Sequence, residues 1–125
     1  FNAHDRINTR VGDLYRDDFG SGYDLILISQ ILHSQTVDQC KILLKKAHAA
    51  LEPHGQLIVH DLLLNEDRTL PPNAAVFSVH MLAVTKGGRA YSAAEVSEWL
   101  LEAGFKQIEH KDVTPRSSIL LAQKK

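Results

Sequence analysis

The chain has 125 residues and a formal net charge of −1, so it can bury one hydrophobic core and is expected to form a single domain over residues 1–125. Its acidic and basic residues are interspersed, which argues against nucleic acid or an anionic membrane as a partner, and its apolar runs are far shorter than the ~20 residues that span a bilayer. Cys40 is the only cysteine, so an internal disulfide is excluded, and we expect a cytoplasmic protein with this thiol in its core.

The first half of the chain is typical of a strand, a helix and a second strand. Residues 6–11 alternate in polarity and form a short extended candidate, and the apolar run over residues 23–32 is typical of a buried parallel strand. Thr36 and Gln39 form a capping box at the start of an amphipathic helix of about four turns. The continuous aliphatic residues at 56–63 predict a second buried strand, and together these elements predict a right-handed βαβ unit.

The second half of the chain predicts two helices and a pair of strands. Residues 74–84 carry apolar side chains on one helical face. A capping box that begins at Ser92 starts the next helix, and Gly104 occupies the position of a left-handed cap at its end. Residues 106–113 and 118–122 predict two strands that are antiparallel to each other. The histidines show no metal-ligand spacing, so no metal site is predicted.

Two polar side chains follow the predicted parallel strands at their carboxyl ends, His33 after the first and Asp61 at the end of the second. Adjacent parallel strands end at the same edge of a sheet, so we expect both side chains to face the crevice where α/β proteins bind ligands. An imidazole can remove a proton from a hydroxyl group, and a carboxylate on its other nitrogen fixes the tautomer. The pair indicates general-base chemistry. Spacing alone leaves the alternative open that His33 caps its strand and Asp61 solvates the next loop.

Five segments of the chain follow one another in the order of a known enzyme family. They are GDLY at 12–15, the run from Tyr23-Asp24 to Ile31-Leu32-His33, AALxPxGQLIV at 49–59, MLxxTxGGRxYSxxE at 81–95 and LEAGF at 101–105. In this order the chain resembles the S-adenosylmethionine-dependent O-methyltransferases, above all the plant and bacterial enzymes that include caffeate, hydroxyindole and polyketide O-methyltransferases. The resemblance covers nearly the whole chain.

This resemblance implies a reaction and a cofactor. It implies methyl transfer from S-adenosylmethionine to a hydroxyl of a small aromatic acceptor. His33 falls on the family's catalytic base, which deprotonates the acceptor. Asp61 falls on the carboxylate that flanks this base, where the family usually has the longer glutamate. Both side chains are therefore expected to be catalytic.

The resemblance also implies residues that contact the cofactor and the substrate. Asp13 and Leu14 fall on the pair that contacts the adenine, and Ser29 falls near the cofactor, where plant members often have lysine. Met81 and Thr85 fall on the wall of the substrate pocket. Two alternatives remain open, because Asp13 also suits a turn and Met81 also suits a helical core.

The sequence departs from the family in several places. Ser34 follows the histidine where plant members commonly have aspartate, and Ala90 replaces a second flanking carboxylate. Nothing corresponds to the Gly-rich turn after the family's first strand, to the acidic residue that grips the ribose, or to the amino-terminal dimerisation domain. The implied fold is a partial Rossmann-like class I methyltransferase sheet. It has parallel strands and a C-terminal antiparallel pair, and it lacks the first two strands of the family order 3-2-1-4-5-7-6.

The missing strands leave the central strand over residues 24–30 as an open edge, which is an aggregation hazard unless it is covered. We therefore expect a homodimer, a fold-back of residues 1–11, or association with a missing amino-terminal half. Two functions remain possible. One is a methyltransferase, or the catalytic part of one, with His33 as base. The other is a non-catalytic methyltransferase-derived module that has lost cofactor binding and acts by self-association or partner association.

Overall fold

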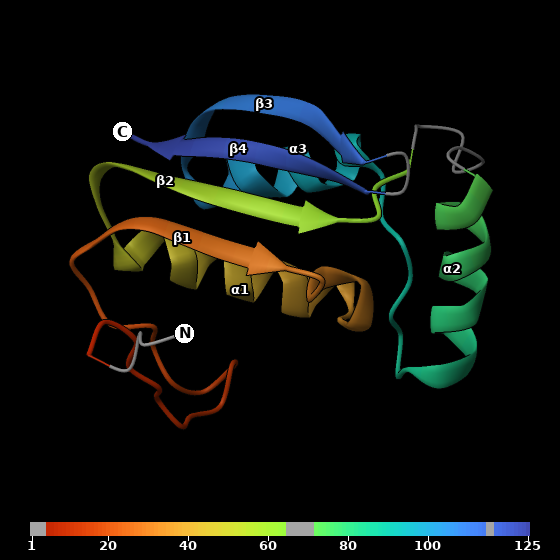
Figure 1. Cartoon of the computed structure of the whole chain (residues 1–125), viewed down its shortest axis with the longest axis horizontal. Coiled ribbons are helices and arrows are strands. Elements are labelled where there is room, and N and C mark those ends of the chain that lie inside the picture. The colour runs from red at the N-terminus through yellow and green to blue at the C-terminus, as the bar shows by residue number, and fades with distance from the viewer. Residues whose placement is uncertain (1–4, 65–71, 115–116) are drawn as a thin grey trace.

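The computed structural model describes residues 5–64, 72–114 and 117–125. It shows one four-stranded sheet with two helices on one of its faces and a third helix at one end (Figure 1). The elements in chain order are β1 (Tyr23–Ser29), the short 3-10 helix η1 (Leu32–Ser34), α1 (Val37–Ala50), β2 (Leu51–Asp61), α2 (Pro72–Val84), α3 (Ala93–Ala103), β3 (Phe105–Thr114) and β4 (Ser117–Lys124).

The strands lie in the order β1-β2-β4-β3. β1 and β2 are parallel, with Ile26 opposite Leu57 and Ser29 opposite His60. β4 is antiparallel to both β2 and β3, which confirms the predicted C-terminal strand pair. This order matches strands 4-5-7-6 of the methyltransferase arrangement, so the expected partial Rossmann-like sheet is confirmed.

The helix boundaries follow local signals in the sequence. Thr36 begins α1 and Ser92 begins α3, and each side chain accepts the amide proton of the third helical residue in a complete capping box. Gly104 ends α3 with a φ of 105°, a left-handed conformation that glycine adopts without steric cost. All three signals were predicted, because a cap depends only on residues within one helical turn.

One strand boundary differs from the prediction. β2 begins at Leu51, which is already extended and pairs with Tyr23, whereas the continuous aliphatics predict a start at residue 56. The pairing with β1 shifts register between Leu51 and Gln56, and residues 52–54 are exposed. The strand therefore starts in a polar segment that the hydrophobic pattern does not mark, because hydrogen bonding to β1 extends it.

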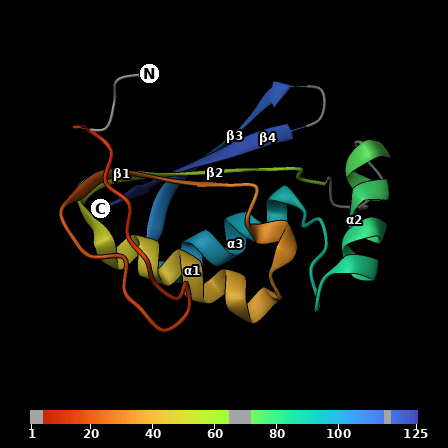
Figure 2. The same ribbon diagram turned by 60° about the horizontal axis from the view of Figure 1, so that its bottom comes forward.

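The core lies between the sheet and the two helices α1 and α3, which Figure 2 shows on the same side of the sheet. Alternate residues of β2 and β4 point toward these helices. Cys40 is fully buried there, as predicted, and burial raises the pKa of its thiol to about 12, so it stays protonated at neutral pH. The other central residues of this core are Leu43, Leu44, Ala47, Leu57, Val59, Val96, Leu100, Phe105 and Leu120.

β1 is an edge strand, because the described part of the chain pairs it with β2 alone. Leu25 and Leu27 point away from the helices and are 55% and 61% exposed. The strand predicted at residues 6–11 is wrong, since these residues are exposed and irregular. In the family order this strand lies beside strands that the described sheet lacks, so it has no partner. Residues 5–11 also do not pair with β1, and residues 1–4 of the expected fold-back lie outside the described residues.

α2 stands at the end of the sheet where β1 and β2 terminate, and it contacts η1 (Figures 1 and 2). It is apolar on most of its surface, and Val76 and Val79 are exposed on its outer side. In the described ranges, no helix is both long enough and apolar enough to cross a membrane. α2 contributes no described residue to the core cluster between the sheet and the helices α1 and α3, but its Met81 is buried.

Candidate catalytic site

The structure brings His33 and Asp61 into direct contact at the carboxyl ends of β1 and β2. His33 Nδ1 lies 2.8 Å from Asp61 Oδ1, and the backbone N–H of His33 donates to Asp61 Oδ2 at 3.3 Å. The backbone N–H of Leu62 also donates to Asp61 Oδ1, at 2.8 Å. Asp61 is 2% exposed, so this buried carboxylate is satisfied by three donors.

This geometry determines which nitrogen of His33 can act as a base. A carboxylate only accepts hydrogen bonds, so the proton between the two side chains belongs to Nδ1 of the imidazole. In the neutral ring, Nε2 then carries the lone pair. The side chain of His33 keeps 14% of its surface exposed, whereas that of Asp61 keeps 3%. An imidazole held in this way by a carboxylate can accept a proton at Nε2.

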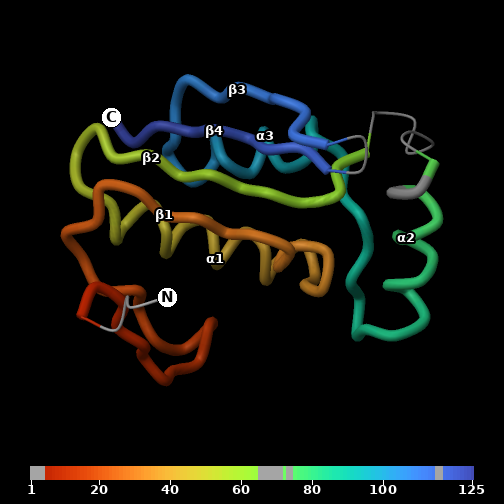
Figure 3. Tube along the Cα trace, viewed as in Figure 1, coloured from red at the N-terminus to blue at the C-terminus, as the bar shows by residue number. Residues whose placement is uncertain are grey.

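The local backbone explains how His33 reaches this position. Gln30 has a φ of 58°, which turns the chain out of the sheet at the end of β1. η1 follows, and its turn is closed by the N–H of Ser34 donating to Ile31 and that of Gln35 donating to Leu32. Figure 3 shows this tight turn between β1 and α1. Leu32 is buried and anchors the turn in the core, so His33 projects from a fixed backbone.

The sequence does not predict that Phe77 contacts His33. The Phe77 ring meets the His33 ring edge to face, with centroids 4.9 Å apart and an interplanar angle of 83°. The helical stripe of residues 74–84 contains this phenylalanine, one turn before Met81, but the sequence carries no signal that the stripe faces His33. The contact depends on where α2 lies relative to η1, which is a tertiary feature.

Met81 and Thr85 lie on the same helix as Phe77 or directly after it. Met81 is buried, in agreement with the helical-core alternative as well as with a pocket wall. The Thr85 hydroxyl donates to the carbonyl of Met81 at 2.7 Å and accepts the N–H of Gly88 at 2.8 Å. The Thr85 hydroxyl thus has protein partners both as a donor and as an acceptor.

Ser29, at the end of β1, belongs to a chain of polar groups across the sheet. Its hydroxyl lies 2.9 Å from His60 Nδ1, and His60 Nε2 lies 2.9 Å from the hydroxyl of Ser117 in β4. A neutral imidazole has one N–H, so one of these two serine hydroxyls accepts a hydrogen bond from the ring and the other donates a hydrogen bond to it. Ser29 is therefore near the strand ends but already has a protein partner.

Asp13 and Leu14 lie in a separate turn. Asp13 Oδ1 accepts the N–H groups of Tyr15 and Arg16 at 2.8 and 3.0 Å, and these hydrogen bonds lower the pKa of Asp13. Lys46 of α1 donates to the carbonyl of Leu14 at 2.9 Å, which ties this turn to the middle of the helix. In the described structure this turn contacts α1 and not the His33–Asp61 pair.

The two positions that depart from the family have structural roles of their own. Ser34 donates to the carbonyl of Ile31 at 2.8 Å and so stabilises η1. Ala90 is buried beside Leu64, and its N–H donates to Ser78 at 3.1 Å. Asp61 is thus the only carboxylate that the described residues place on His33.

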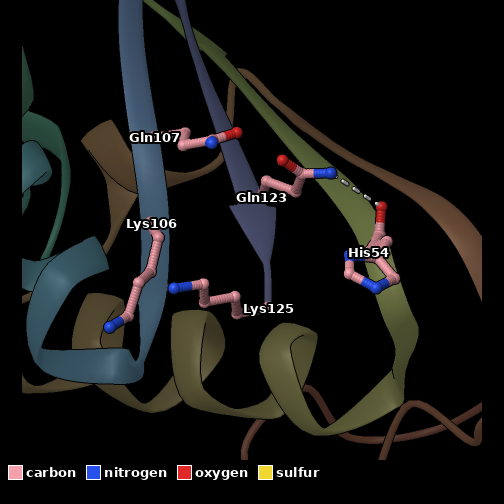
Figure 4. A pocket seen from close by; sticks show the side chains of 5 residues that line it. All are labelled: His54, Lys106, Gln107, Gln123 and Lys125. Atoms are coloured by element: carbon pink, nitrogen blue, oxygen red, sulfur yellow. Dashed lines mark hydrogen bonds between the residues drawn. The ribbon is translucent and has the colours of Figure 1, made fainter.

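A surface hollow of about 240 Å³ lies at the opposite end of the strands (Figure 4). It is lined by His54, Lys106, Gln107, Gln123 and Lys125, and Gln123 Nε2 donates to the His54 carbonyl at 3.4 Å. Figure 4 shows the Lys106 ammonium directed away from Gln123 and His54. This hollow has no paired acid and base, so the His33–Asp61 end is the better candidate site.

Comparison with known proteins identifies the family of the chain. Residues 1–106 match the model of the O-methyltransferase domain family. A 3-hydroxy-5-methyl-1-naphthoate 3-O-methyltransferase from Streptomyces sahachiroi is 36% identical over 103 residues, which are 82% of this chain and 30% of that protein. The chain therefore spans about a third of the length of the curated relatives that it matches.

Solved structures of O-methyltransferases also match nearly the whole of this chain, and the chain again covers about a third of each. A candidate O-methyltransferase from Nostoc punctiforme superimposes with a TM-score of 0.92 at 36% identity, covering 98% of this chain and 38% of that one. Human N-acetylserotonin methyltransferase, solved with S-adenosylmethionine, superimposes with a TM-score of 0.83 at 28% identity and covers 92% of this chain and 33% of that one. The sequence, the fold and these matches agree, and the chain belongs to the O-methyltransferase domain family.

Proposed function

We propose that this chain is the base-carrying part of a methyltransferase that methylates a hydroxyl of a small aromatic molecule, with His33 as general base. The observation that carries the proposal is the 2.8 Å contact between His33 Nδ1 and Asp61 Oδ1 at the carboxyl ends of parallel strands. The names of two relatives support a small aromatic acceptor. One is a 3-hydroxy-5-methyl-1-naphthoate 3-O-methyltransferase, and the other is an acetylserotonin O-methyltransferase.

In this proposal His33 Nε2 takes the proton of the acceptor hydroxyl. The oxygen then forms a bond to the methyl carbon while the bond from that carbon to sulfur breaks, so the products are a methyl ether and S-adenosylhomocysteine. Asp61 holds the ring in the correct tautomer and stabilises the imidazolium that forms. S-adenosylmethionine, when bound, supplies a methyl group on a positively charged sulfur that is already activated for transfer. A positioned base of this kind contributes about two to four orders of magnitude in rate.

The three residues expected to contact S-adenosylmethionine carry groups that suit this role. They supply only part of a binding site, because nothing in the sequence corresponds to the Gly-rich turn. The carboxylate of Asp13 and the side chain of Leu14 are both exposed, so they are open to an adenine ring. Ser29 lies at the end of β1 and offers a hydroxyl. We propose that these three residues contact the cofactor, with further contacts from a partner that carries the Gly-rich turn.

The acceptor would lie against α2. Phe77 offers an aromatic ring beside the imidazole, and Met81 offers a polarisable thioether one turn further along the helix. Aromatic rings favour such edge contacts by about 0.5–1.5 kcal/mol beyond the area that they bury. Met81, Thr85 and Phe77 are therefore proposed as the wall that receives an aromatic acceptor.

Two measurements test this function. Calorimetric titration of the chain with S-adenosylhomocysteine is expected to show binding, and methyl transfer from S-adenosylmethionine to a hydroxynaphthoate is expected above background. His33→Ala should leave the affinity nearly unchanged and lower turnover by about two to four orders of magnitude. His54→Ala, in the hollow at the other end of the sheet, is the matched control and should keep full turnover. Full turnover in His33→Ala would remove the base from the mechanism.

A second function is favoured by the exposed edge and face of β1. Leu25 and Leu27 are exposed on a strand whose outer edge has no partner among the described residues, and such edges bind other chains. We propose that a second copy or an amino-terminal half of the same family covers this edge. Light scattering should then show a dimer, and Leu27→Glu should lower the dimer fraction. A monomer that binds no S-adenosylhomocysteine would exclude the homodimer and methyl transfer by this chain alone, and would leave an amino-terminal half as the partner to test.

A further inference from the structure

η1, which carries His33, is held from two sides. Asp61 of β2 holds it on the sheet side, as described above. On the other side lies the segment of residues 85–91, which follows α2 and runs to the start of α3. At its far end, the Tyr91 hydroxyl donates to the carbonyl of Gln35, directly after η1. Burial raises the pKa of Tyr91, so this hydroxyl keeps its proton as a donor at neutral pH.

Within this segment, the buried Gly88 lies against the backbone of His33. A Cβ atom at this position would lie 2.3 Å from the carbonyl oxygen of His33 and 3.0 Å from Cα of Ser34. Both of these atoms are backbone atoms, so neither can rotate away. The backbone of residue 88 thus packs directly on the backbone of η1, and only glycine permits this spacing.

Gly88 is also held by hydrogen bonds to the end of α2. Its N–H donates to the hydroxyl of Thr85, and that hydroxyl donates to the carbonyl of Met81 in the last turn of α2. The same hydroxyl oxygen would lie 2.4 Å from a Cβ at position 88. A side chain at this position would therefore have to displace either the end of α2 or the turn that holds His33.

The neighbouring Gly87 provides a contrast. It has a φ of 95°, and a Cβ there would meet Cγ2 of Thr36 at 2.9 Å, at the start of α1. Gly87 is thus required for its backbone conformation and touches the helix cap. Gly88 has no positive φ, so its requirement is steric and concerns His33.

We infer that Gly88 is a positioning residue for the base: the absence of its side chain lets residues 85–91 press η1 into the place where His33 Nδ1 meets Asp61. Gly88 itself carries no reacting atom and acts through His33. This inference rests on the proposed function for its catalytic meaning. The packing itself can be measured on the chain without turnover.

The test compares Gly88→Ala with Gly87→Ala in the 125-residue chain labelled with nitrogen-15. Ring nitrogen shifts report the tautomer of His33, and amide exchange at Ser34 and Gln35 reports the closed turn of η1. We expect Gly88→Ala to abolish the pure Nδ1–H tautomer and to speed exchange of both amides by about tenfold or more. Gly87→Ala should lower the melting temperature about as much as Gly88→Ala does. It should nevertheless leave the His33 tautomer as in the wild type.

An unchanged tautomer and unchanged amide exchange in a folded Gly88→Ala would overturn the inference. If that variant does not fold, Thr85→Val takes its place, because it removes the hydroxyl that holds Gly88 and adds no clash at His33. The same faster exchange at Ser34 and Gln35 is expected, and wild-type exchange in this variant would also overturn the inference. A wild-type chain with the Nε2–H tautomer at His33 would instead refute the proposed general base, while the exchange data would still decide the role of Gly88.

Discussion

Asp61 binds both the ring and the backbone of His33, at 2.8 Å through Oδ1 and at 3.3 Å through Oδ2. The same carboxylate therefore orients the imidazole and fixes the turn that carries it. Replacement of Asp61 by asparagine keeps the shape but adds an N–H₂ group that can donate to Nδ1 and so reverse the tautomer. We expect Asp61→Asn to lower methyl transfer by about two to four orders of magnitude, as loss of the base would.

The matched variant for this prediction is Asp61→Glu, because the family usually has glutamate at this position. It keeps the charge and should retain part of the turnover. Asp61→Asn should also cost about 1–3 kcal/mol in the free energy of unfolding, which urea titration measures, because its buried neighbours lose a charged acceptor. Full turnover in Asp61→Asn would contradict the role proposed for the carboxylate.

Phe77 contacts His33 edge to face from α2. If it forms the wall for an aromatic acceptor, Phe77→Ala should raise the KM for a hydroxynaphthoate by about two- to tenfold, since the contact contributes ~0.5–1.5 kcal/mol. Affinity for S-adenosylhomocysteine should not change. Val79→Ala on the exposed side of the same helix is the control and should keep the wild-type KM. A KM that rises equally in both variants would point to a general effect on α2.

His48 gives the fold a pH dependence. Burial lowers its pKa from the usual 6.5, and the nearby Lys124 ammonium lowers it further. The unfolded chain therefore binds this proton more readily than the folded chain, so His48 destabilises the fold as the pH falls below about 6.5. Above that value both states are neutral at this residue, and the effect vanishes. The loss levels off below the lowered pKa.

Urea unfolding of the wild type and of His48→Gln at pH 7.5 and 5.5 measures this effect. The wild type should lose more stability between the two pH values than the variant, because glutamine cannot titrate. Loss of the edge contact with Phe105 lowers the stability of the variant at both pH values and cancels in the comparison. Equal losses in the two proteins would show that His48 does not contribute.

Gly104 ends α3 in a left-handed conformation against the same histidine. Its φ is 105°, and a Cβ would lie 3.0 Å from His48 Nε2. Gly104→Ala should cost about 1–3 kcal/mol in the free energy of unfolding, from backbone strain and this contact. Gly20→Ala is the comparison: it has a φ of 89° in an exposed turn and a nearest Cβ contact of 3.3 Å to the Tyr23 hydroxyl. It should cost less, and a larger loss at Gly20 would contradict the role of the helix cap.

Local signals in the sequence were enough to predict most of the fold. The two capping boxes and Gly104 act within one helical turn, and the aliphatic run of β2 is buried against the helices as predicted. The burial predicted for β1 is wrong on the face of Leu25 and Leu27, because the described sheet has nothing that covers it. The expectation that His33 and Asp61 meet also followed from the sequence, because neighbouring parallel strands end at one edge. Their catalytic role, and the cofactor and substrate roles of Asp13, Leu14, Ser29, Met81 and Thr85, remain predictions.

Other features depended on tertiary structure alone. The segment at residues 6–11 has a strand pattern but no neighbouring strand, so it stays irregular, and β2 begins early because β1 offers hydrogen bonds to a polar segment. Phe77 and Gly88 reach His33 from parts of the chain more than 40 residues away. The sequence by itself therefore determined most of the elements and the meeting of His33 with Asp61. The packing around that pair was decided by the placement of α2 and the segment after it, because contacts between distant segments have no local pattern.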